Sequence, residues 1–265
     1  MSPADPGRPG YVRLVRAPNP GPMTLEGTNT WLVGDPDEGP PVVVDPGPAI
    51  AAHLDAVLAA AGGRLAGVIL THRHADHSEG AAELAGRAGC GVRALDPTFQ
   101  RGPDGLPDGA VIVVGSVSLT VHHTPGHTSD SCSLLLRGRD GTAWLLTGDT
   151  VLGRGTTVIT HPDGDLGAYL GSLDRLQRLV SEERVVALLP GHGPPVDDPV
   201  ERLEHYVRHR RQRLAEVRAA LADGARTPAE VVDRVYVGLD PSVRPAAEQS
   251  VRAQLHYLSS LSPGS

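Results

Sequence analysis

The sequence contains no lysine, so every one of its basic side chains other than histidine is an arginine. Aromatic residues make up only 3% of the 265 residues, and a core must therefore be built mainly from Val, Leu, Ile and Ala. Only two cysteines are present, Cys90 and Cys132, and they form no CxxC pair. They provide no disulfide framework, and we expect two small buried thiols.

Long apolar runs are also missing. No run approaches the ~20 residues that a membrane span needs, and the Pro- and Gly-rich segment 1–10 lacks the apolar stretch of a signal peptide. We therefore expect a cytoplasmic protein without a membrane partner, beginning with a flexible tail at 1–10. The net charge of −7 argues against a surface that coats nucleic acid, although a local basic patch is compatible with it.

Strand and helix patterns alternate along most of the chain, which predicts an α/β protein. The expected strands are 30–34, 41–45, 65–71, 110–114, 117–123, 133–137, 143–147 and 185–189. The expected helices between them are 49–61, 78–88 and 166–180.

After residue 198 the pattern contains helices only, at 200–222, 227–236 and 245–258. The second of these begins with Thr-Pro and has Glu230 three residues after Thr227, which is a capping-box pattern. We expect one domain over 1–198 and an all-helical C-terminal domain over 199–265.

Four potential metal ligands lie within six residues in the segment His72-Arg-His74-Ala-Asp76-His77. The segment directly follows an expected buried strand. In an extended loop His72 and His74 lie on the same side, while Asp76 and His77 turn toward a neighbouring position. Imidazole and carboxylate together suit zinc, with iron and manganese as second choices. This geometry indicates two metal ions more readily than one.

Three further candidates stand at the ends of expected strands: His127 in TPGHT, Asp149 in TGDT and His192 in PGHG. A neighbouring glycine in each lets the backbone turn sharply and approach closely. Any one of these motifs alone is usually only a turn. Because ligands in α/β folds gather at strand ends, all four motifs together favour a metal site.

The four motifs resemble those of the metallo-β-lactamase superfamily over residues 23 to about 195. The resemblance implies a four-layer αββα sandwich with two zinc ions at one edge of its two sheets. The ligands that it implies are His72, His74 and His127 for the first zinc, Asp76, His77 and His192 for the second, and Asp149 between them. It also implies that Asp45, in the segment VDPG, supports a ligand histidine.

The chain is more closely similar to the lactamase-beta-like endoribonuclease group, which is related to RNase Z and glyoxalase II. The segments that carry this similarity are 19–30, 152–157, 190–194 and 205–210. It implies a winged-helix-like C-terminal domain, although only a short segment follows the last expected helix, so we expect the wing to be missing or vestigial. On the substrate side it implies Asn29 and Thr156, and we add His161, which follows the GRGTT loop.

The expected reaction is hydrolysis by a hydroxide that bridges two zinc ions, with Asp76 accepting a proton or orienting the nucleophile as in relatives. The first hypothesis is an endoribonuclease-like phosphodiesterase acting on single-stranded RNA. The alternative is a thioesterase acting on acyl-CoA, an acyl-carrier protein or a glutathione thioester, as in glyoxalase II. The complete ligand set disfavours an iron-dependent sulfur dioxygenase and a non-catalytic nucleic-acid-binding regulator. A homodimer is a further expectation that the sequence leaves open.

The expected helix at 200–222 is rich in arginine. It could present a phosphate-binding face to RNA or to a phosphopantetheine carrier. It could equally be a solvated helix with i,i+4 ion pairs such as Glu204–Arg208. The solvated helix is the favoured interpretation.

Overall fold

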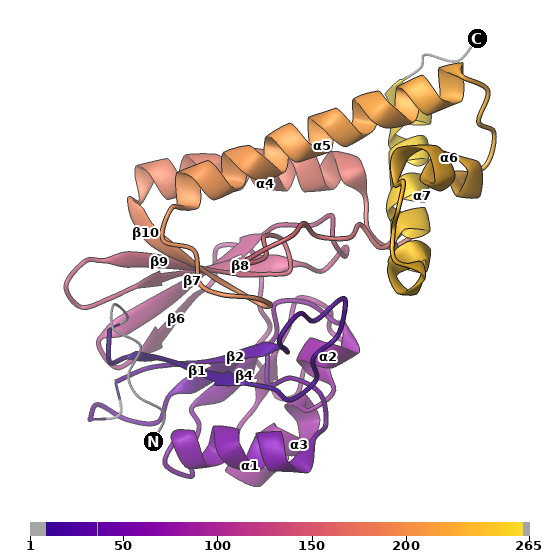
Figure 1. Cartoon of the computed structure of the whole chain (residues 1–265). Coiled ribbons are helices and arrows are strands. Elements are labelled where there is room, and N and C mark those ends of the chain that lie inside the picture. The colour runs from indigo at the N-terminus through magenta and orange to yellow at the C-terminus, as the bar shows by residue number, and fades with distance from the viewer. Residues whose placement is uncertain (1–8, 36, 262–265) are drawn as a thin grey trace.

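Two five-stranded sheets lie face to face between two layers of helices in the computed structural model (Figure 1), which describes residues 9–35 and 37–261. The expected four-layer α/β sandwich is confirmed. Most of the predicted tail at 1–10 lies outside the described residues. Within the described residues, no helix is long and apolar enough to cross a membrane.

The first sheet has the strand order β1-β2-β3-β4-β5. Its strands are β1 (Val12–Arg16), β2 (Asn29–Val33), β3 (Val42–Val44), β4 (Gly67–Ile69) and β5 (Val92–Arg93). The pairs β1–β2 and β2–β3 are antiparallel, and the other two are parallel. Helices α1 (Ala51–Ala60) and α3 (Ala81–Ala88) cover its outer face (Figure 1).

The second sheet has the order β10-β9-β8-β7-β6. Its strands are β6 (Val111–Val114), β7 (Val117–His123), β8 (Cys132–Arg137), β9 (Ala143–Gly148) and β10 (Val185–Pro190). Only β9 and β10 pair in parallel. Helix α4 (Leu166–Glu182) and the first half of α5 (Pro199–Ala222) lie over its outer face (Figure 1).

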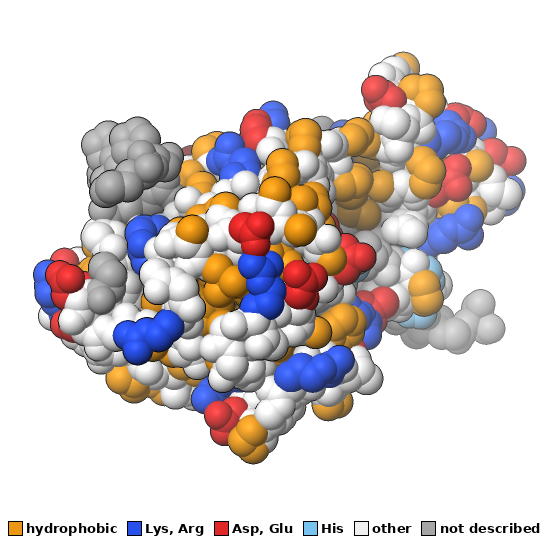
Figure 2. All heavy atoms as spheres, turned by 90° about the horizontal axis from the view of Figure 1, so that it is seen from below, with side chains coloured by type: hydrophobic (Ala, Val, Ile, Leu, Met, Phe, Trp, Pro, Cys, Tyr) orange, Lys and Arg blue, Asp and Glu red, His pale blue; other side chains and the backbone are white. Residues whose placement is uncertain are grey.

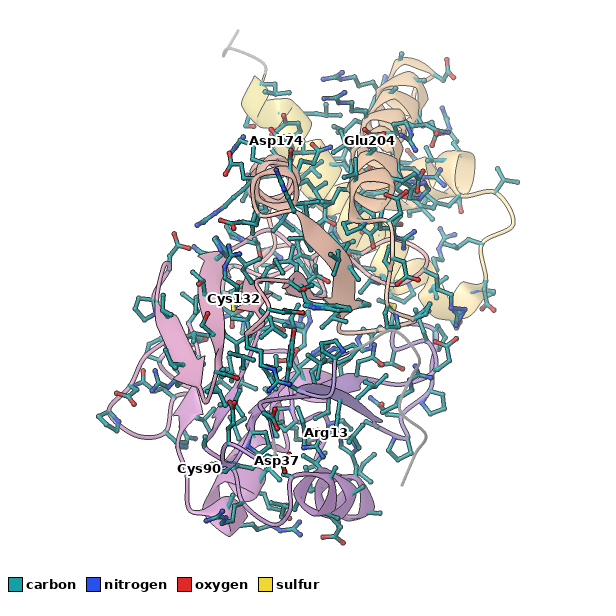
Figure 3. All side chains as sticks on the ribbon, turned by 90° about the vertical axis from the view of Figure 1, so that its left-hand side faces the viewer. Arg13, Asp37, Cys90, Cys132, Asp174 and Glu204 are labelled. Atoms are coloured by element: carbon teal, nitrogen blue, oxygen red, sulfur yellow. The ribbon has the colours of Figure 1, made fainter. Side chains whose placement is uncertain are left out.

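The space between the sheets is filled mainly by valine and leucine, with Tyr11, Trp31 and Trp144 as the large exceptions. Cys132 belongs to this core, whereas Cys90 is only half-buried, so the expectation of two buried thiols holds for one of them. Figure 3 places the two cysteines in different layers of the molecule, and both are free thiols.

The expected helix at 78–88 is wrong in its first part. The chain forms one helical turn, α2 (Ala75–Ser78), and then a separate α3. Gly80 lies between them, where an added Cβ would approach Leu54 Cδ2 to 2.8 Å and the Gly47 carbonyl oxygen to 3.1 Å. Close packing against the start of α1 therefore sets the break, and the extended part of the ligand segment ends at His74.

Helix α5 continues beyond the sandwich, and α6 (Pro228–Val235) and α7 (Arg244–Leu261) pack around its far end (Figure 1). These helices share a small core of their own, which includes Val217, Val231 and Val251. The predicted capping box is confirmed, since the Thr227 hydroxyl accepts the backbone N–H of Glu230 and the Glu230 carboxylate accepts that of Thr227. From residue 191 to 261 the described chain adds no further strand.

Charged side chains of both signs are interspersed on the face that carries α1 and α3 (Figure 2). The net charge of −7 is thus not gathered into a single acidic patch on this face. Nothing there favours attraction of an extended polyanion or polycation.

Candidate metal centre

Five segments bring candidate metal donors to one edge of the sandwich. His72 and His74 follow β4, and α2 presents Asp76 and His77. The others follow the ends of strands in the second sheet. They are His127 after β7, Asp149 after β9 and His192 after β10. These residues form three overlapping groups, within each of which the donor atoms lie within 4.8 Å of one another.

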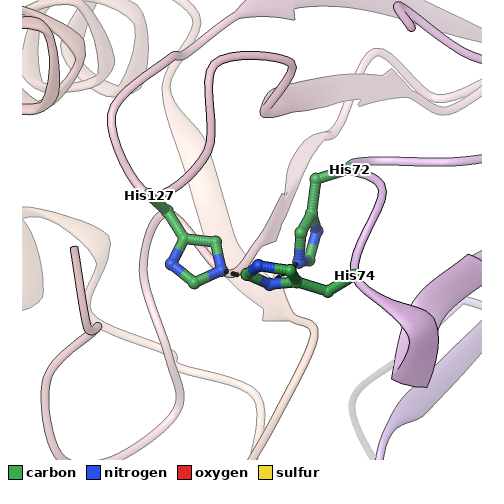
Figure 4. Close-up of side chains that lie close together, drawn as sticks. All are labelled: His72, His74 and His127. Atoms are coloured by element: carbon green, nitrogen blue, oxygen red, sulfur yellow. Dashed lines mark hydrogen bonds between the residues drawn. The ribbon is translucent and has the colours of Figure 1, made fainter. Parts of the chain in front are cut away.

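The first group joins His72, His74 and His127 (Figure 4). Nδ1 of His74 lies 3.1 Å from Nε2 of His72 and 3.0 Å from Nε2 of His127. Two donors bound to one tetrahedral ion at ~2.0–2.1 Å lie about 3.3 Å apart. The spacing of the three nitrogens therefore fits a shared cation.

The second group joins Asp76, His77 and His192. Nε2 of His192 lies 3.2 Å from Nε2 of His77 and 3.1 Å from Oδ2 of Asp76. Asp149 reaches both groups, because its Oδ2 is 3.8 Å from Nε2 of His127 and 3.4 Å from Nε2 of His192. Oδ1 of Asp149 is buried without a hydrogen-bond partner in the described chain. A buried carboxylate oxygen in that state is what a divalent cation would satisfy.

The side chain of Asp45 is buried behind this centre and accepts hydrogen bonds from the backbone N–H (2.8 Å) and the hydroxyl (2.7 Å) of Thr71. Its Oδ2 also lies 2.9 Å from Nδ1 of His77. A carboxylate at Nδ1 keeps the proton there and leaves Nε2 free to face a metal. Asp45 thus contacts His77, one of the predicted ligand histidines, and its support of a metal ligand stays a prediction.

The histidines of the first group are held neutral, which is the form that binds metal. Burial lowers the pKa of His127 to about 4, although Asp149 opposes the shift. Burial and the neighbouring His77 and His127 also hold the pKa of His72 well below its usual value.

The second group attracts positive charge. Burial disfavours protonation of His192, yet Asp149 and Asp76 outweigh it and raise its pKa to about 9. Burial likewise disfavours the charged form of Asp149, but His192 and His77 hold its pKa well below the usual range. Asp76 and Asp149 thus favour positive charge in this half of the centre. A divalent metal ion bound there would take the place of the proton on His192.

Arg73 stands between two candidate ligand histidines, His72 and His74, and was not predicted to contribute. Its guanidinium forms ion pairs with Asp163 and with Asp96 (3.3 Å), and donates to the Ser129 hydroxyl at 3.0 Å. It therefore ties the ligand segment to three other loops. The sequence offers no local signal for this, because the acidic partners are 23 and 90 residues away along the chain.

A cavity of about 270 Å³ begins at His127 and Asp149 and continues between the 152–158 loop and the C-terminal helices. Met23 and Leu25 line one side of it, and Leu239 and Val243 line the other. Most of its wall is thus apolar, as is usual for pockets that bind small molecules.

The three predicted substrate-side residues have different environments. Thr156 lines the cavity, and its hydroxyl lies 3.3 Å from Nε2 of His209. Asn29 is buried and donates to the carbonyl oxygens of Pro190 (2.9 Å) and Gly193 (2.8 Å). Asn29 therefore holds the loop that carries His192 and does not face the cavity. The ring of His161 lies outside the cavity lining, 5.6 Å from the ring of His256 on α7.

The arginines of α5 also differ from one another. Arg208 pairs with Glu201 (3.0 Å) and Glu204 (3.2 Å), as expected for a solvated helix. Arg210, in contrast, is only 3% exposed. Arg210 and Arg213 both line the cavity. Neither a solvated helix nor a phosphate-binding face therefore accounts for all the arginines of α5.

Two family models match the chain. One, described as "Metallo-beta-lactamase superfamily", matches residues 23–192, and one described as "Beta-lactamase associated winged helix domain" matches residues 227–260. The "Beta-lactamase-like protein 2 homolog" of Caenorhabditis elegans is 32% identical over 93% of this chain and 83% of its own length.

An "Atrochrysone carboxyl ACP thioesterase" of Aspergillus fumigatus is 32% identical over 89% of this chain and 76% of its own length. Among solved structures, a metallo-beta-lactamase family protein from Thermus thermophilus superposes with a TM-score of 0.78 at 23% identity, over 94% of this chain and 93% of the other. That likeness concerns the fold.

Proposed function

Because the chain belongs to the metallo-β-lactamase superfamily, whose members are metal-dependent hydrolases, we propose that it hydrolyses acyl thioesters at a dinuclear metal centre. The observation that carries the proposal is the largely apolar cavity that begins at His127 and Asp149. An acyl chain loses apolar surface to water on entering such a cavity, whereas a nucleotide backbone does not.

A relative supports the same substrate class. The thioesterase from Aspergillus fumigatus aligns with 89% of this chain at 32% identity, which is more than the sandwich domain alone. The hypothesis of an RNA phosphodiesterase has less support. Arg208, an exposed arginine of α5 that a phosphate could reach, is already paired with two glutamates.

We assign the donors as the family resemblance implies. His72, His74 and His127 would hold the first ion, Asp76, His77 and His192 would hold the second, and Asp149 lies close enough to contact both. Zinc suits these imidazole and carboxylate donors best. Bound metals of this kind lower the pKa of water toward ~7 and stabilise a developing oxyanion.

The protein's own groups orient the reaction. Asp76 has the most exposed of the carboxylates in the centre, with 30% of its side chain accessible against 12% for Asp149. Its Oδ2 lies 3.1 Å from Nε2 of His192. We assign to Asp76 the acceptance of a proton from the nucleophile, because it can contact both the centre and an incoming molecule.

The deciding experiment combines metal analysis with a substrate panel. The purified protein should contain two zinc ions per chain and hydrolyse an acyl thioester, and a chelator should abolish this activity. The same samples are offered single-stranded RNA and bis-p-nitrophenyl phosphate. Turnover of RNA without turnover of the thioester would restore the phosphodiesterase hypothesis, and one iron per chain would overturn the dizinc assignment.

The bridging assignment has its own test in Asp149→Ala. We expect metal content and activity to fall together, with activity lower by at least about 100-fold, since even outer partners of metal ligands cost 10–100-fold. Metal analysis and thioester turnover measure both effects. Asp174→Ala, at an exposed position on α4 (Figure 3), is the control. Full metal content and activity in Asp149→Ala would contradict the assignment.

A further inference from the structure

Arg210 is a buried cation without an acidic partner. Its Nη2 donates to the Thr157 carbonyl oxygen, and its guanidinium carbon lies 4.9 Å from the centre of the Tyr169 ring. Its Nε has no hydrogen-bond partner within the described chain, and no carboxylate of residues 9–35 and 37–261 forms an ion pair with it. Burying an unpaired charge is unfavourable, so this arrangement calls for an anion that arrives with a ligand.

Arg213 presents a second guanidinium to the same cavity, about one helical turn further along α5. Its Nη1 forms an ion pair with Glu216 (2.7 Å) and donates to the Val235 carbonyl oxygen (3.2 Å), and the group stacks over the ring of Tyr236 at 4.6 Å. These contacts fix the orientation of the guanidinium and use only one of its nitrogens as a donor. A fixed guanidinium fork is well suited to a carboxylate.

Because Arg213 is paired with Glu216, Arg210 supplies the unpaired positive charge at this end of the cavity. Burial, together with Arg210 and Arg213, lowers the pKa of His209 to about 4, so that this side chain is neutral. Arg154 is paired with Glu26 at 2.5 Å. The carboxylate of Asp149 lies at the opposite end, in the metal centre.

The short span between the two ends of the cavity indicates which part of a thioester brings the anion. Thr157 links the two ends, since its carbonyl oxygen accepts from Arg210 and its hydroxyl donates to the Asp149 carbonyl oxygen at 2.6 Å. Because one residue contacts both ends, a short acyl chain can reach from the candidate metal centre to Arg210.

We propose that Arg210 and Arg213 bind a carboxylate at the far end of a short acyl chain, so that the preferred substrates are thioesters of dicarboxylic acids. The inference rests on the proposed thioesterase function and names the substrate class of the same site. The metal centre would receive the thioester carbonyl while the two arginines fix the other end of the chain.

The test compares glutaryl with pentanoyl thioesters, which differ by a terminal carboxylate. Each acyl group is attached to coenzyme A and, separately, to pantetheine, which carries no phosphate. We expect kcat/KM for the glutaryl thioester to exceed that of the pentanoyl thioester at least tenfold in both series. Arg213→Gln should bring the ratio close to one, and Arg213→Lys, which keeps the charge but not the planar fork, should keep only part of it. Arg211→Gln, an exposed neighbour on α5, is the matched control and should keep it fully.

Binding of the free acids separates failure of this inference from failure of the proposed function. Calorimetry should show glutarate binding more tightly than pentanoate to the metal-loaded protein, with the difference lost in Arg213→Gln. Thioester turnover without any glutaryl preference would overturn the inference alone. A preference confined to the coenzyme A series would assign the anion to a phosphate and likewise overturn it. Glutarate binding that depends on Arg213, without thioester turnover, would support the anion site and reject the thioesterase.

Discussion

At the scale of single residues, Asp45 is the carboxylate that faces Nδ1 of His77 behind the candidate metal centre. Its carboxylate accepts two hydrogen bonds from Thr71 and lies 2.9 Å from Nδ1 of His77. The residue adopts a positive φ of 53°, a conformation that Asn also tolerates well. Asp45→Asn therefore changes the chemistry of the contact with little effect on the backbone.

We expect Asp45→Asn to weaken metal binding by about 10–100-fold, because an amide N–H opposite Nδ1 favours the His77 tautomer with its proton on Nε2. Competition with a chromogenic chelator measures the affinity. Asp55→Asn is the control, because Asp55 lies on α1, has 66% of its side chain exposed and pairs with Arg87 at the surface. Unchanged affinity in Asp45→Asn would mean that Asp45 does not set the tautomer.

The candidate donors were predictable because each lies in a short motif next to a glycine or within the His72–His77 segment. Residues that act through distant partners were not. The burial of Arg210 depends on Thr157, 53 residues away, and on Tyr169 of α4. Asn29 is a residue type that can contact a substrate, but its amide donates to the carbonyl oxygens of Pro190 and Gly193. These two residues lie in a loop at the other end of the sandwich domain's sequence.

At the scale of secondary structure, α3 offers two glycines with opposite roles. Gly89 ends the helix with a φ of 66°, whereas Gly86 lies inside the helix, and an added Cβ would meet nothing within 4 Å at either position. The two positions therefore differ in backbone conformation and not in packing. Their substitutions by alanine separate these two effects.

Gly89→Ala should lower the free energy of unfolding by about 1–2 kcal/mol, since the left-handed conformation is unfavourable for a residue with a Cβ. Gly86→Ala should raise it by about 0.5–1 kcal/mol, because alanine loses less backbone entropy in a helix. Urea unfolding of both variants measures the changes. If both substitutions changed the free energy of unfolding in the same direction, the left-handed conformation at the end of α3 would not control the effect of Gly89→Ala.

Most helices and strands agree with the apolar periodicity of the sequence. Those that differ from the prediction depend on contacts with other parts of the fold. β1 is an edge strand that pairs with β2 alone among the described strands, and three of its five residues are half-buried, so it has a weak pattern of its own. β5 contains only two residues. The break between α2 and α3 depends on contact of Gly80 with α1, which no local pattern contains.

At the scale of the whole molecule, α5 belongs to two cores. Leu203, Tyr206 and Leu214 join the cluster beneath α4, while Val217 and Ala220 join that of α6 and α7. The predicted domain boundary at residue 198 stays a prediction. We propose that the first half of α5 completes the sandwich, which places the change of core near Val217.

Truncation tests this proposal. A chain ending at residue 198 loses four α5 side chains of the sandwich core, and at 1.5–3 kcal/mol each this amounts to roughly 6–12 kcal/mol, comparable to the whole stability of a domain. We expect this chain not to unfold cooperatively, and a chain ending at residue 224 to do so. Thermal unfolding followed by circular dichroism measures both. Cooperative unfolding of the shorter chain would support the boundary at 198.

The candidate donors are spread unevenly along the chain, and this sets an order in time during synthesis. Four of them lie between residues 72 and 77, while His192 follows His77 by 115 residues. A nascent chain that has made only the first sheet offers four of the seven candidate donors. His127, Asp149 and His192 join them only when the second sheet has formed. The candidate centre is therefore complete only in a chain whose two sheets are both folded.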